Sequence, residues 1–269
     1  MTGSTPVRVD TTQPHPARMY DHYLGGKDHY EADAEAAARV LEVFPGMRTC
    51  ARVNRAFMHR AVRWLAAEAG IRQFLDVGTG IPTEPNLHQV AQAVAPECRV
   101  VYADNDPIVL VYAQALLKGT AAGRTSYIQA DVRDPAGILG AAELRGTLDL
   151  GRPVALCLGA LLHFVRDEDG PYEVVAHLVG ALPSGSYLML SHCTPGFAPE
   201  AWERVGAVYG SGGIRAQVRG RTEVADFFSG LELVEPGVTM PHLWKPDREP
   251  PPGISPADVS MYAGVARKP

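Results

Sequence analysis

The sequence predicts an α/β fold, built on a parallel and doubly wound sheet. Two observations support this prediction. From Ile71 onward, short apolar runs alternate with segments of helical pattern, which is typical of strands joined by crossover helices. The stretch FLDVGTGIPTEPN, residues 74–86, places a glycine-rich loop directly after the first of these runs. Ligands of such sheets bind beyond the carboxyl ends of the strands, so we expect the functional residues there.

Residues 17–70 are expected to be mostly helical and to precede the sheet. The segment 28–43 is rich in Ala and Glu and stops at a Pro-Gly pair, and a longer amphipathic helix follows over 47–69. Arg52 and Arg55 lie near the start of that helix. Either this basic face is solvated, or one of the two arginines, with Arg55 the candidate, binds an anionic group of a cofactor.

Seven strands are expected, with helical segments between the first five. The expected strands span residues 72–77, 99–103, 125–130, 153–158, 186–191, 231–234 and 261–266. Thr83 is expected to cap a helix that runs to about Ala95. Another helix should begin at Asp106 and stop near Gly119, and a third should cover 171–182.

Composition and length exclude several classes of protein. The 269 residues are 46% hydrophobic, enough for one large domain or one domain with an appended cap. A net charge of −5 argues against a nucleic-acid surface, and no apolar run is long enough for a membrane helix. Residues 1–16 lack a signal-peptide core and are expected to form a disordered tail, so we predict a cytoplasmic protein. The four cysteines form no CxxC pair, so no metal site is expected.

The loop after the first strand indicates which cofactor the sheet binds. Gly78 and Gly80, with Thr79 between them, permit positive φ and a close approach of the backbone to a ligand. A dinucleotide fingerprint would have its third glycine at position 83, where this chain has Thr83. Asp76 at the strand end would repel a pyrophosphate but would suit an ammonium or sulfonium group. Because S-adenosylmethionine carries both, we predict this cofactor.

The next two strand ends carry acids that fit the same ligand. Asp104 follows Gly80 by 24 residues, where an acid can hold the two hydroxyls of a ribose. Asp131 can accept a hydrogen bond from an adenine amino group, and Val132 can pack on the ring. Taken singly, Asp104 could cap a helix and Asp131 could belong to an ordinary turn. Acids at three successive strand ends beside a glycine loop together predict an adenosine pocket with a cationic tail.

The fourth strand end indicates where an acceptor of the methyl group would lie. Gly159 leaves room at the rim of the sheet, and His163 and Phe164 follow it. His163 is a candidate general base near neutral pH. The alternative is a buried histidine that is hydrogen-bonded to the backbone. No Asn-Pro-Pro-Tyr sequence occurs here, which argues against amide or nucleobase N-methylation of that kind.

Longer stretches of the chain resemble one known family. ARMYDHYLGGKDHYEAD, ARVNRAFMHRAVRWLA, GIRQFLDVGTGIPTEPNLHQVAQ and VVYADNDPIVL are similar to an actinobacterial family of S-adenosylmethionine-dependent methyltransferases, long catalogued as a domain of unknown function. The likeness continues through RPVALCLGALLHFV, GSYLMLSHCT and HLWKPD, and it covers residues 17–269.

The resemblance implies both a fold and a site. The fold would be a Rossmann-like class I methyltransferase, with a seven-stranded core over residues 71–269 and a helical N-terminal cap over 17–70. Some members of the family methylate carbon C3 of an indole in tryptophan-containing cyclic dipeptides. The residues that match the cofactor motifs of the family are Asp76, Gly78, Gly80, Asp104, Asn105, Asp131 and Val132.

The segment GGKD, residues 25–28, has a different interpretation. It lacks the Ser or Thr of a phosphate loop and no strand precedes it, so nucleotide hydrolysis is not expected. Tyr20, Tyr23 and His29 lie around it in the sequence. They form either an aromatic lid over a substrate or part of the packing of the cap.

These observations favour a methyltransferase that acts on a small molecule. For an indole acceptor, a base that accepts the N–H proton would help, and the candidates are His163 and Tyr23. The expected substrate contacts are Tyr20, His29 and Phe164. The alternatives are O- or N-methylation of another secondary metabolite, an NAD-dependent oxidoreductase, and a non-catalytic module that senses S-adenosylmethionine.

Overall fold

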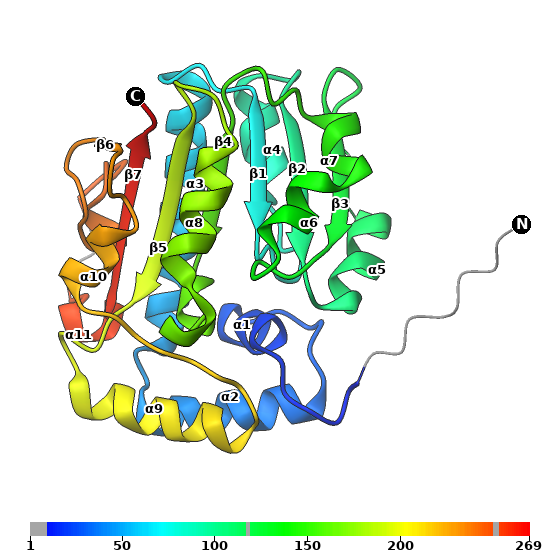
Figure 1. Ribbon diagram of the computed structural model, residues 1–269. Helices are drawn as coiled ribbons and strands as arrows, with labels where there is room; N and C mark the ends of the chain where they lie inside the picture. The colour runs from blue at the N-terminus through cyan, green and yellow to red at the C-terminus, as the bar shows by residue number, and fades with distance from the viewer. Residues whose placement is uncertain (1–9, 117–118, 250–252) are drawn as a thin grey trace, which may run out of the picture.

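The computed structural model describes residues 10–116, 119–249 and 253–269 and contains one seven-stranded sheet (Figure 1). The strands are β1 (Gln73–Val77), β2 (Arg99–Asp104), β3 (Arg124–Gln129), β4 (Ala155–Gly159), β5 (Tyr187–Cys193), β6 (Glu232–Leu233) and β7 (Met261–Arg267). Their order in the sheet is β3-β2-β1-β4-β5-β7-β6. Strands β1 to β5 are parallel, and β7 is antiparallel to both β5 and β6. The predicted doubly wound, mostly parallel sheet is therefore confirmed.

Helices cover both faces of the sheet. They are α3 (Met47–Ala67), α4 (Leu87–Val94), α5 (Pro107–Leu116), α6 (Pro135–Gly140), α7 (Ala142–Thr147), α8 (Pro171–Gly180) and α10 (Arg221–Asp226). Shorter turns are η1 (Leu162–Phe164), η2 (Asp167–Asp169), η3 (Pro241–Leu243) and α11 (Pro256–Val259). No helix in the described part of the chain is long and apolar enough to cross a membrane.

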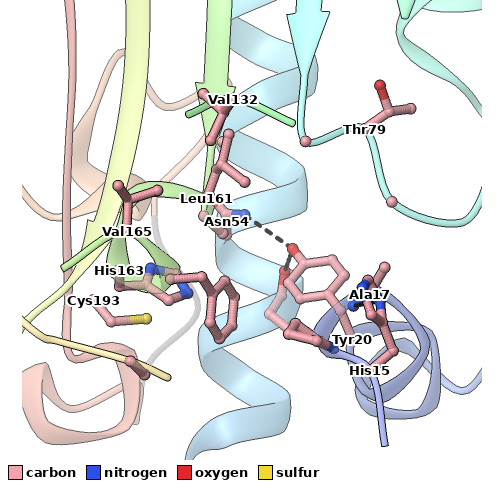
Figure 2. Close-up of a pocket in the computed structure, with 18 of the residues that line it drawn as sticks. His15, Ala17, Tyr20, Asn54, Thr79, Val132, Leu161, His163, Val165 and Cys193 are labelled. Atoms are coloured by element: carbon pink, nitrogen blue, oxygen red, sulfur yellow. Dashed lines mark hydrogen bonds between the residues drawn. The ribbon is translucent and has the colours of Figure 1, made fainter. Parts of the chain in front are cut away.

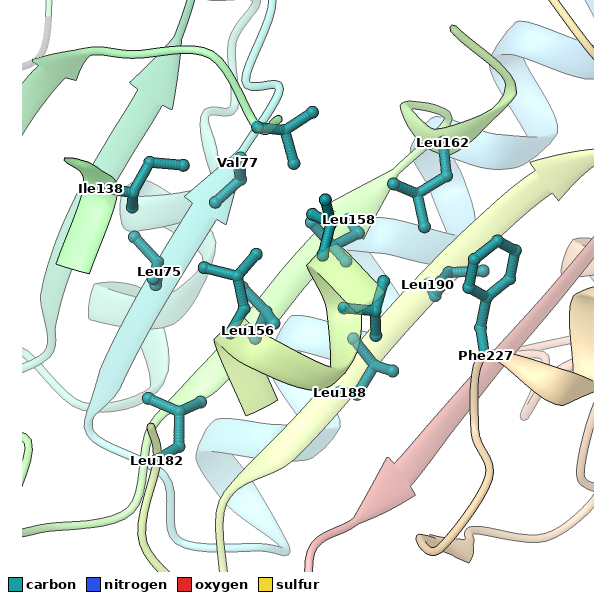
Figure 3. Packing of buried hydrophobic residues seen from close by; sticks show 14 of the residues in the cluster. Leu75, Val77, Ile138, Leu156, Leu158, Leu162, Leu182, Leu188, Leu190 and Phe227 are labelled. Atoms are coloured by element: carbon teal, nitrogen blue, oxygen red, sulfur yellow. The ribbon is translucent and has the colours of Figure 1, made fainter. Parts of the chain in front are cut away.

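Side chains alternate along each strand and so divide the core into two layers. Leu75, Leu156 and Leu188 occupy matching positions on β1, β4 and β5 and lie on one face of the sheet (Figure 3). Helices α6, α7, α8 and α10 cover that face. On the opposite face, Phe74 and Tyr102 pack with α3 and α4. Burying one such leucine or phenylalanine contributes about 1.5–3 kcal/mol, so the alternating pattern holds the sheet between its helices.

A helical cap lies beyond the carboxyl ends of the parallel strands (Figure 1). It contains α1 (Pro16–Leu24), α2 (Glu31–Val43), the first half of α3 and α9 (Pro199–Ser211). Each of the four helices contributes to one buried cluster, for example through Met19, Val40, Cys50 and Trp202. The cap is thus built from two separate parts of the chain, because α9 follows β5.

Two expectations about the cap need correction. No helix is expected from the sequence over α9, although Trp202, Val205 and Tyr209 recur at helical spacing and are buried. The cap also begins before residue 17: Pro16 starts α1, and the N–H of His15 donates to Oδ1 of Asp33 at 2.8 Å. Residues 14–16 are therefore partly buried in the cap and residues 10–13 are exposed, while residues 1–9 of the expected tail lie outside the described residues.

Helix α4 begins three residues later than expected. Its N-cap is Asn86 rather than Thr83, and the N–H of Asn86 donates to Oε1 of Gln89 at 2.6 Å. Thr83 instead lies in the loop before the helix, where its carbonyl oxygen accepts from Arg55. The expected end near Ala95 is confirmed, since Ala95 is the C-cap.

Two other boundaries also differ from the expected ones. Helix α2 starts at Glu31, after an N-cap at Tyr30 whose N–H donates to Oδ2 of Asp33 at 2.9 Å. Strand β6 is only two residues long. Helix α5 is described up to Leu116, and the residues between it and the expected stop near Gly119 lie outside the described residues.

Candidate functional site

A cavity of about 200 Å³ lies between the strand ends and the cap (Figure 2). Its lining comes from the loops after β1 to β4 and from α1, α3 and α9. Of the predicted site residues, it contains Tyr20, Tyr23, Arg55, Gly78, Thr79, Gly80, Asp104, Asn105, Asp131, Val132, Gly159, His163 and Phe164. Asp76 and His29 do not line it. The fold therefore brings the four predicted strand ends to one space.

Two glycines shape the loop after β1. Gly78 has φ +73° and Gly80 has φ +68°, in the left-handed region that other residues rarely adopt. A Cβ atom on Gly78 would stand 2.5 Å from Cδ1 of Leu161, which is closer than the two atoms can pack. The N–H of Gly80 donates to Oδ2 of Asp104 at 2.8 Å, which ties the loop to the end of β2. The predicted need for positive φ is confirmed at both positions.

Asp104 is held by the backbone at the end of β2. Besides the bond from Gly80, its Oδ1 accepts from the N–H of Asp106 at 2.9 Å. Burial raises the pKa of Asp104, and the two N–H bonds oppose that shift. The cap of α5 is Asp106, whose Oδ1 accepts from the N–H of Ile108 at 3.0 Å. Because Asp106 takes the capping role, Asp104 is not needed for it.

Asp131 and Val132 form a second part of the cavity wall. Arg133 binds the Asp131 carboxylate through Nε at 2.9 Å and Nη2 at 2.5 Å. This bond is the main reason that the pKa of Asp131 lies below its usual value, and a hydrogen bond from Asn105 adds to it. Arg133 also lines the cavity and was not predicted. Its position two residues after Asp131 in QADVRD was the available signal.

Asp76 points away from this cavity, against expectation. Leu75 and Val77 belong to the core layer under α6 to α8, so Asp76 between them faces the opposite layer. There it lines a much smaller cavity together with Arg55 and His59. Burial raises the pKa of Asp76 to about 7, and the charge of Arg55 opposes this shift. A carboxyl group behind the glycine loop, partly protonated near pH 7, does not meet a ligand in the main cavity directly.

Arg55 lines both cavities. Its Nη2 donates to the carbonyl oxygens of Thr83 and of Pro85, the latter at 3.0 Å. Its Nε is buried and has no hydrogen-bond partner among the described residues. The interpretation as a solvated face therefore fails for Arg55, which holds the loop before α4 and keeps one buried donor unpaired.

A buried ion cluster seats the start of α1 over the cavity. His15 and Ala17 line the cavity on the side opposite His163 (Figure 2). Nδ1 of His15 lies 3.1 Å, and Nε of Arg18 3.3 Å, from Oδ2 of Asp106. Arg18 also lies 3.4 Å from the α2 residue Asp33. Breaking a buried ion pair costs about 3–5 kcal/mol, so this cluster fixes the cap on the core.

Asn54 on α3 joins the cap to the sheet and was not predicted from the sequence. Its Nδ2 donates to the hydroxyl oxygen of Tyr20 at 2.9 Å (Figure 2), and its Oδ1 accepts from Oγ of Ser191 at 2.6 Å. The same Oγ accepts from the N–H of Ala160 at 2.9 Å, and the Tyr20 hydroxyl donates to the carbonyl of Ala51 at 3.0 Å. A polar residue within the apolar face of helix 47–69 was the signal for this chain of bonds.

His163 is buried beside the cavity in η1. Burial and the nearby His192 and Arg219 lower the pKa of His163 well below 6.5, so its imidazole is neutral near pH 7. Its Nδ1 has no hydrogen-bond partner within the described part of the chain. The alternative of a ring hydrogen-bonded to the backbone is therefore not supported at Nδ1. The ring packs against Phe164, with centroids 4.4 Å apart.

Tyr23 and His29 differ in their surroundings. Tyr23 lines the cavity, and its hydroxyl lies 3.5 Å from that of Tyr209. Burial raises the pKa of Tyr23 well above its usual 10, so the phenol stays protonated and is not a base at neutral pH. His29 instead donates to Asp21 at 2.8 Å and lies 3.3 Å from His22. His29 thus packs the cap, whereas Tyr20 and Tyr23 face the cavity.

The side of the cavity around His163 is apolar. Its lining residues are Met47, Cys50, Phe164, Cys193, Trp202, Val205, Tyr209, Ala216, Val218 and Met261. The ionised lining residues Arg55, Asp104, Asp131 and Arg133 belong to the other side, near the glycine loop. Within the residues that the structure describes, no group of three or more His, Cys, Asp or Glu side chains could hold a metal ion. One cavity therefore combines a polar half with an uncharged half.

Comparison with known proteins relates the whole chain to one family. A family profile described as S-adenosyl methyltransferase matches residues 2–269. A DUF574 family protein from Streptomyces avermitilis is 54% identical, with a TM-score of 0.95 over 97% of this chain and 100% of that one. A candidate methyltransferase from Thermobifida fusca is 39% identical, with a TM-score of 0.89 over 96% of each chain.

More distant structures share the fold. The N-methyltransferase NodS from Bradyrhizobium japonicum, in complex with S-adenosylhomocysteine, is 14% identical, with a TM-score of 0.50 over 94% of this chain and 99% of that one. A search of curated proteins gives no match. The near relatives therefore define the family, and the distant one supports a class I methyltransferase fold.

The variant Asp76→Asn tests the buried carboxyl group. The pKa of Asp76 is about 7 in the folded chain against an ordinary 3.8, so between these values the native state holds a proton that the unfolded state has released. Native stability therefore falls as pH rises through this range, by roughly 1 kcal/mol per pH unit, and Asn lacks this slope. Urea unfolding at several pH values between about 4.5 and 8 measures it. Equal slopes for wild type and variant would contradict the buried acid, and the exposed Asp226→Asn is the matched control.

Proposed function

This chain belongs to the S-adenosyl methyltransferase family, and we propose that it transfers a methyl group from S-adenosylmethionine to a small, uncharged and largely apolar acceptor. The finer proposal is carbon C3 of an indole in a tryptophan-containing cyclic dipeptide, in natural-product biosynthesis. The observation that supports the substrate class is the uncharged half of the cavity around His163. A charged acceptor would lose its hydration there without gaining an ionic partner.

The polar half fits the cofactor. Of the glycines in this half, only Gly80 has open space where a Cβ would lie, while a Cβ on Gly78 or Gly159 would meet the side chain of Leu161 or Met58, so the wall of this half is close-packed and free of bulky side chains at the glycines. We propose that Asp104 holds the ribose hydroxyls and that Asp131 and Val132 hold the adenine. The unpaired Nε of Arg55 is a buried donor beside this half. The cofactor carboxylate is the group that such a donor would bind.

Proton transfer is assigned to His163. S-adenosylmethionine supplies an activated methyl group, so the chain has to position the acceptor about 3–3.5 Å from that methyl, in line with the sulfur, and to exclude water. When a neutral carbon or nitrogen nucleophile is methylated, it becomes cationic and its N–H proton becomes acidic. A weak, neutral base then suffices. The lowered pKa of His163 fits that task better than deprotonation of an alcohol, which needs a stronger base.

We propose that the protonated tyrosines of the cavity help to position the acceptor and do not act as bases. The Tyr20 hydroxyl is bound to Asn54 and Ala51, and burial raises its pKa to about 12. The Tyr23 hydroxyl is paired with Tyr209. We propose that the rings of Tyr20 and Phe164 support an aromatic acceptor by packing against it.

The cellular setting is part of the same proposal. All four cysteines are free thiols and are buried. That arrangement supports the expectation of a reducing cytoplasm. The net charge of −5 supports a small-molecule acceptor rather than a nucleic acid.

A panel of acceptors tests the substrate class. We expect the full chain with S-adenosylmethionine to methylate a tryptophan-containing cyclic dipeptide, with the new methyl on C3 by NMR. The linear dipeptide of the same residues carries two terminal charges, and we expect its turnover to be at least about 100-fold lower, which corresponds to roughly 3 kcal/mol. Equal use of both would contradict an uncharged pocket. Faster methylation of a phenol on oxygen would favour the O-methyltransferase alternative.

Calorimetry with S-adenosylhomocysteine tests the cofactor half. Asp104→Asn removes a charged hydrogen-bond acceptor, so we expect a loss of roughly 1.5–3 kcal/mol, or about 10- to 100-fold in Kd. The exposed Asp226→Asn should keep the wild-type Kd. Binding of NAD in place of S-adenosylhomocysteine would revive the oxidoreductase alternative.

Replacement of His163 tests the proton acceptor. We expect His163→Asn to lower kcat by about 10²- to 10⁴-fold, the usual contribution of a general base, and to leave the Kd of S-adenosylhomocysteine within about threefold. His177→Asn, at an exposed histidine on α8, is the control. If His163→Asn retains kcat within a few-fold of wild type, His163 is not the base.

A further inference from the structure

Arg219 is a fully buried arginine next to the cavity, with 0% of its surface exposed. Its guanidinium donates to the carbonyl oxygens of Leu162 at 3.0 Å and Val165 at 2.9 Å, on either side of His163. It also donates to Oδ1 of Asp167 at 2.6 Å. Burying a cation is costly unless it is paired with acceptors. Here two of the acceptors are carbonyl oxygens of the turn that carries His163.

A further partner of Arg219 fixes the proton of His192 on β5. Nη1 of Arg219 lies 3.0 Å from Nε2 of His192, and an arginine can only donate. Nε2 is therefore the acceptor, and the imidazole proton is on Nδ1, which donates to the carbonyl oxygen of Cys193 at 2.7 Å. Protonation of Nε2 would place a second positive charge against Arg219. Burial is the main reason that the pKa of His192 falls to about 3, and Arg219 adds to it.

The neutral ring of His192 packs edge-on against His163, with centroids 5.4 Å apart. The N–H of Gln217, two residues before Arg219, donates to the carbonyl oxygen of His163 at 2.8 Å. The charged or titratable groups that face His163 are Arg219 from the segment before α10 and His192 from β5. The turn and the ring of His163 are thus held from two sides by residues distant in the sequence.

We infer that Arg219 and His192 are positioning residues for His163: Arg219 binds the carbonyl groups on both sides of it, and the His192 ring packs edge-on against its imidazole. This inference rests on the proposed role of His163 as proton acceptor. Neither residue lines the cavity, so both act through His163 rather than on the substrate. An uncharged imidazole can accept a proton and does not repel a sulfonium. A protonated imidazole cannot accept a further proton and would repel the sulfonium charge.

The variant Arg219→Gln removes the charge and keeps a side-chain donor. An NMR titration of ¹³C-labelled histidines in the full chain, with the His163 signal assigned through His163→Asn, measures the effect without turnover. We expect the titration midpoint of His163 to lie well below 6.5 in the wild type and to rise in the variant, but to stay below 6.5 because burial is the larger cause of the lowered pKa. We also expect kcat to fall about 10- to 100-fold while the Kd of S-adenosylhomocysteine stays within about threefold.

The variant Arg219→Lys keeps the charge but cannot span both carbonyl oxygens. We expect His163 to remain neutral in it and kcat to fall about tenfold, because the turn is held less firmly. This variant also tests the inference if Arg219→Gln does not fold. Arg221→Gln is the matched control, since Arg221 bonds to the carbonyl of Val238 instead and should change neither measurement.

The inference is overturned if folded Arg219→Gln leaves both the His163 titration and kcat at wild-type values, or if Arg219→Lys retains wild-type kcat. Failure of the proposed function gives a different result. In that case His163→Asn retains turnover, while the His163 titration still moves in Arg219→Gln because that readout does not depend on catalysis.

Discussion

The site depends on the point between the parallel strands β1 and β4 at which the strand order reverses. The two strands are neighbours, but the chain continues from β1 to β2 on one side and from β4 to β5 on the other. The loops that follow them therefore diverge, and a space remains at their carboxyl ends. Glycines line both sides of this space. A Cβ on Gly78 or Gly159 would meet Leu161 or Met58, so those positions leave no room for a side chain.

Helix α3 extends this geometry into the cap, because it belongs to two cores at once. Cys50 and Val53 in its first half pack with the cap, and Phe57 and Leu65 in its second half pack on the sheet. Asn54 lies where the two halves meet and bonds to both sides. Cap and sheet thus share one continuous helix, which positions the proposed acceptor side of the cavity relative to the proposed cofactor side.

The two halves of the cavity differ in whether charged side chains line them. Near the glycine loop, carboxylates are held by backbone N–H groups or by an arginine, as Asp104 and Asp131 are. Around His163 the lining is uncharged, and the cation of Arg219 is directed into carbonyl oxygens behind the wall. In a low-dielectric interior, an unpaired charge would dominate the site. Keeping ionised groups on one side suits the joining of a charged donor to a neutral acceptor.

The sheet, its strand ends and the cofactor could be predicted from the sequence, because apolar runs, glycines and strand-end acids are local signals. Most of the residues that we propose to bind the cofactor, such as Gly78, Asp104 and Asp131, could be named in this way. Three features could not be predicted from the sequence: Asp76 faces the layer behind the cavity, α9 completes the cap, and His163 is neutral. The physical reason is that burial, side-chain direction and charge state depend on contacts between distant segments. His163, His192 and Arg219 meet only when the chain is folded.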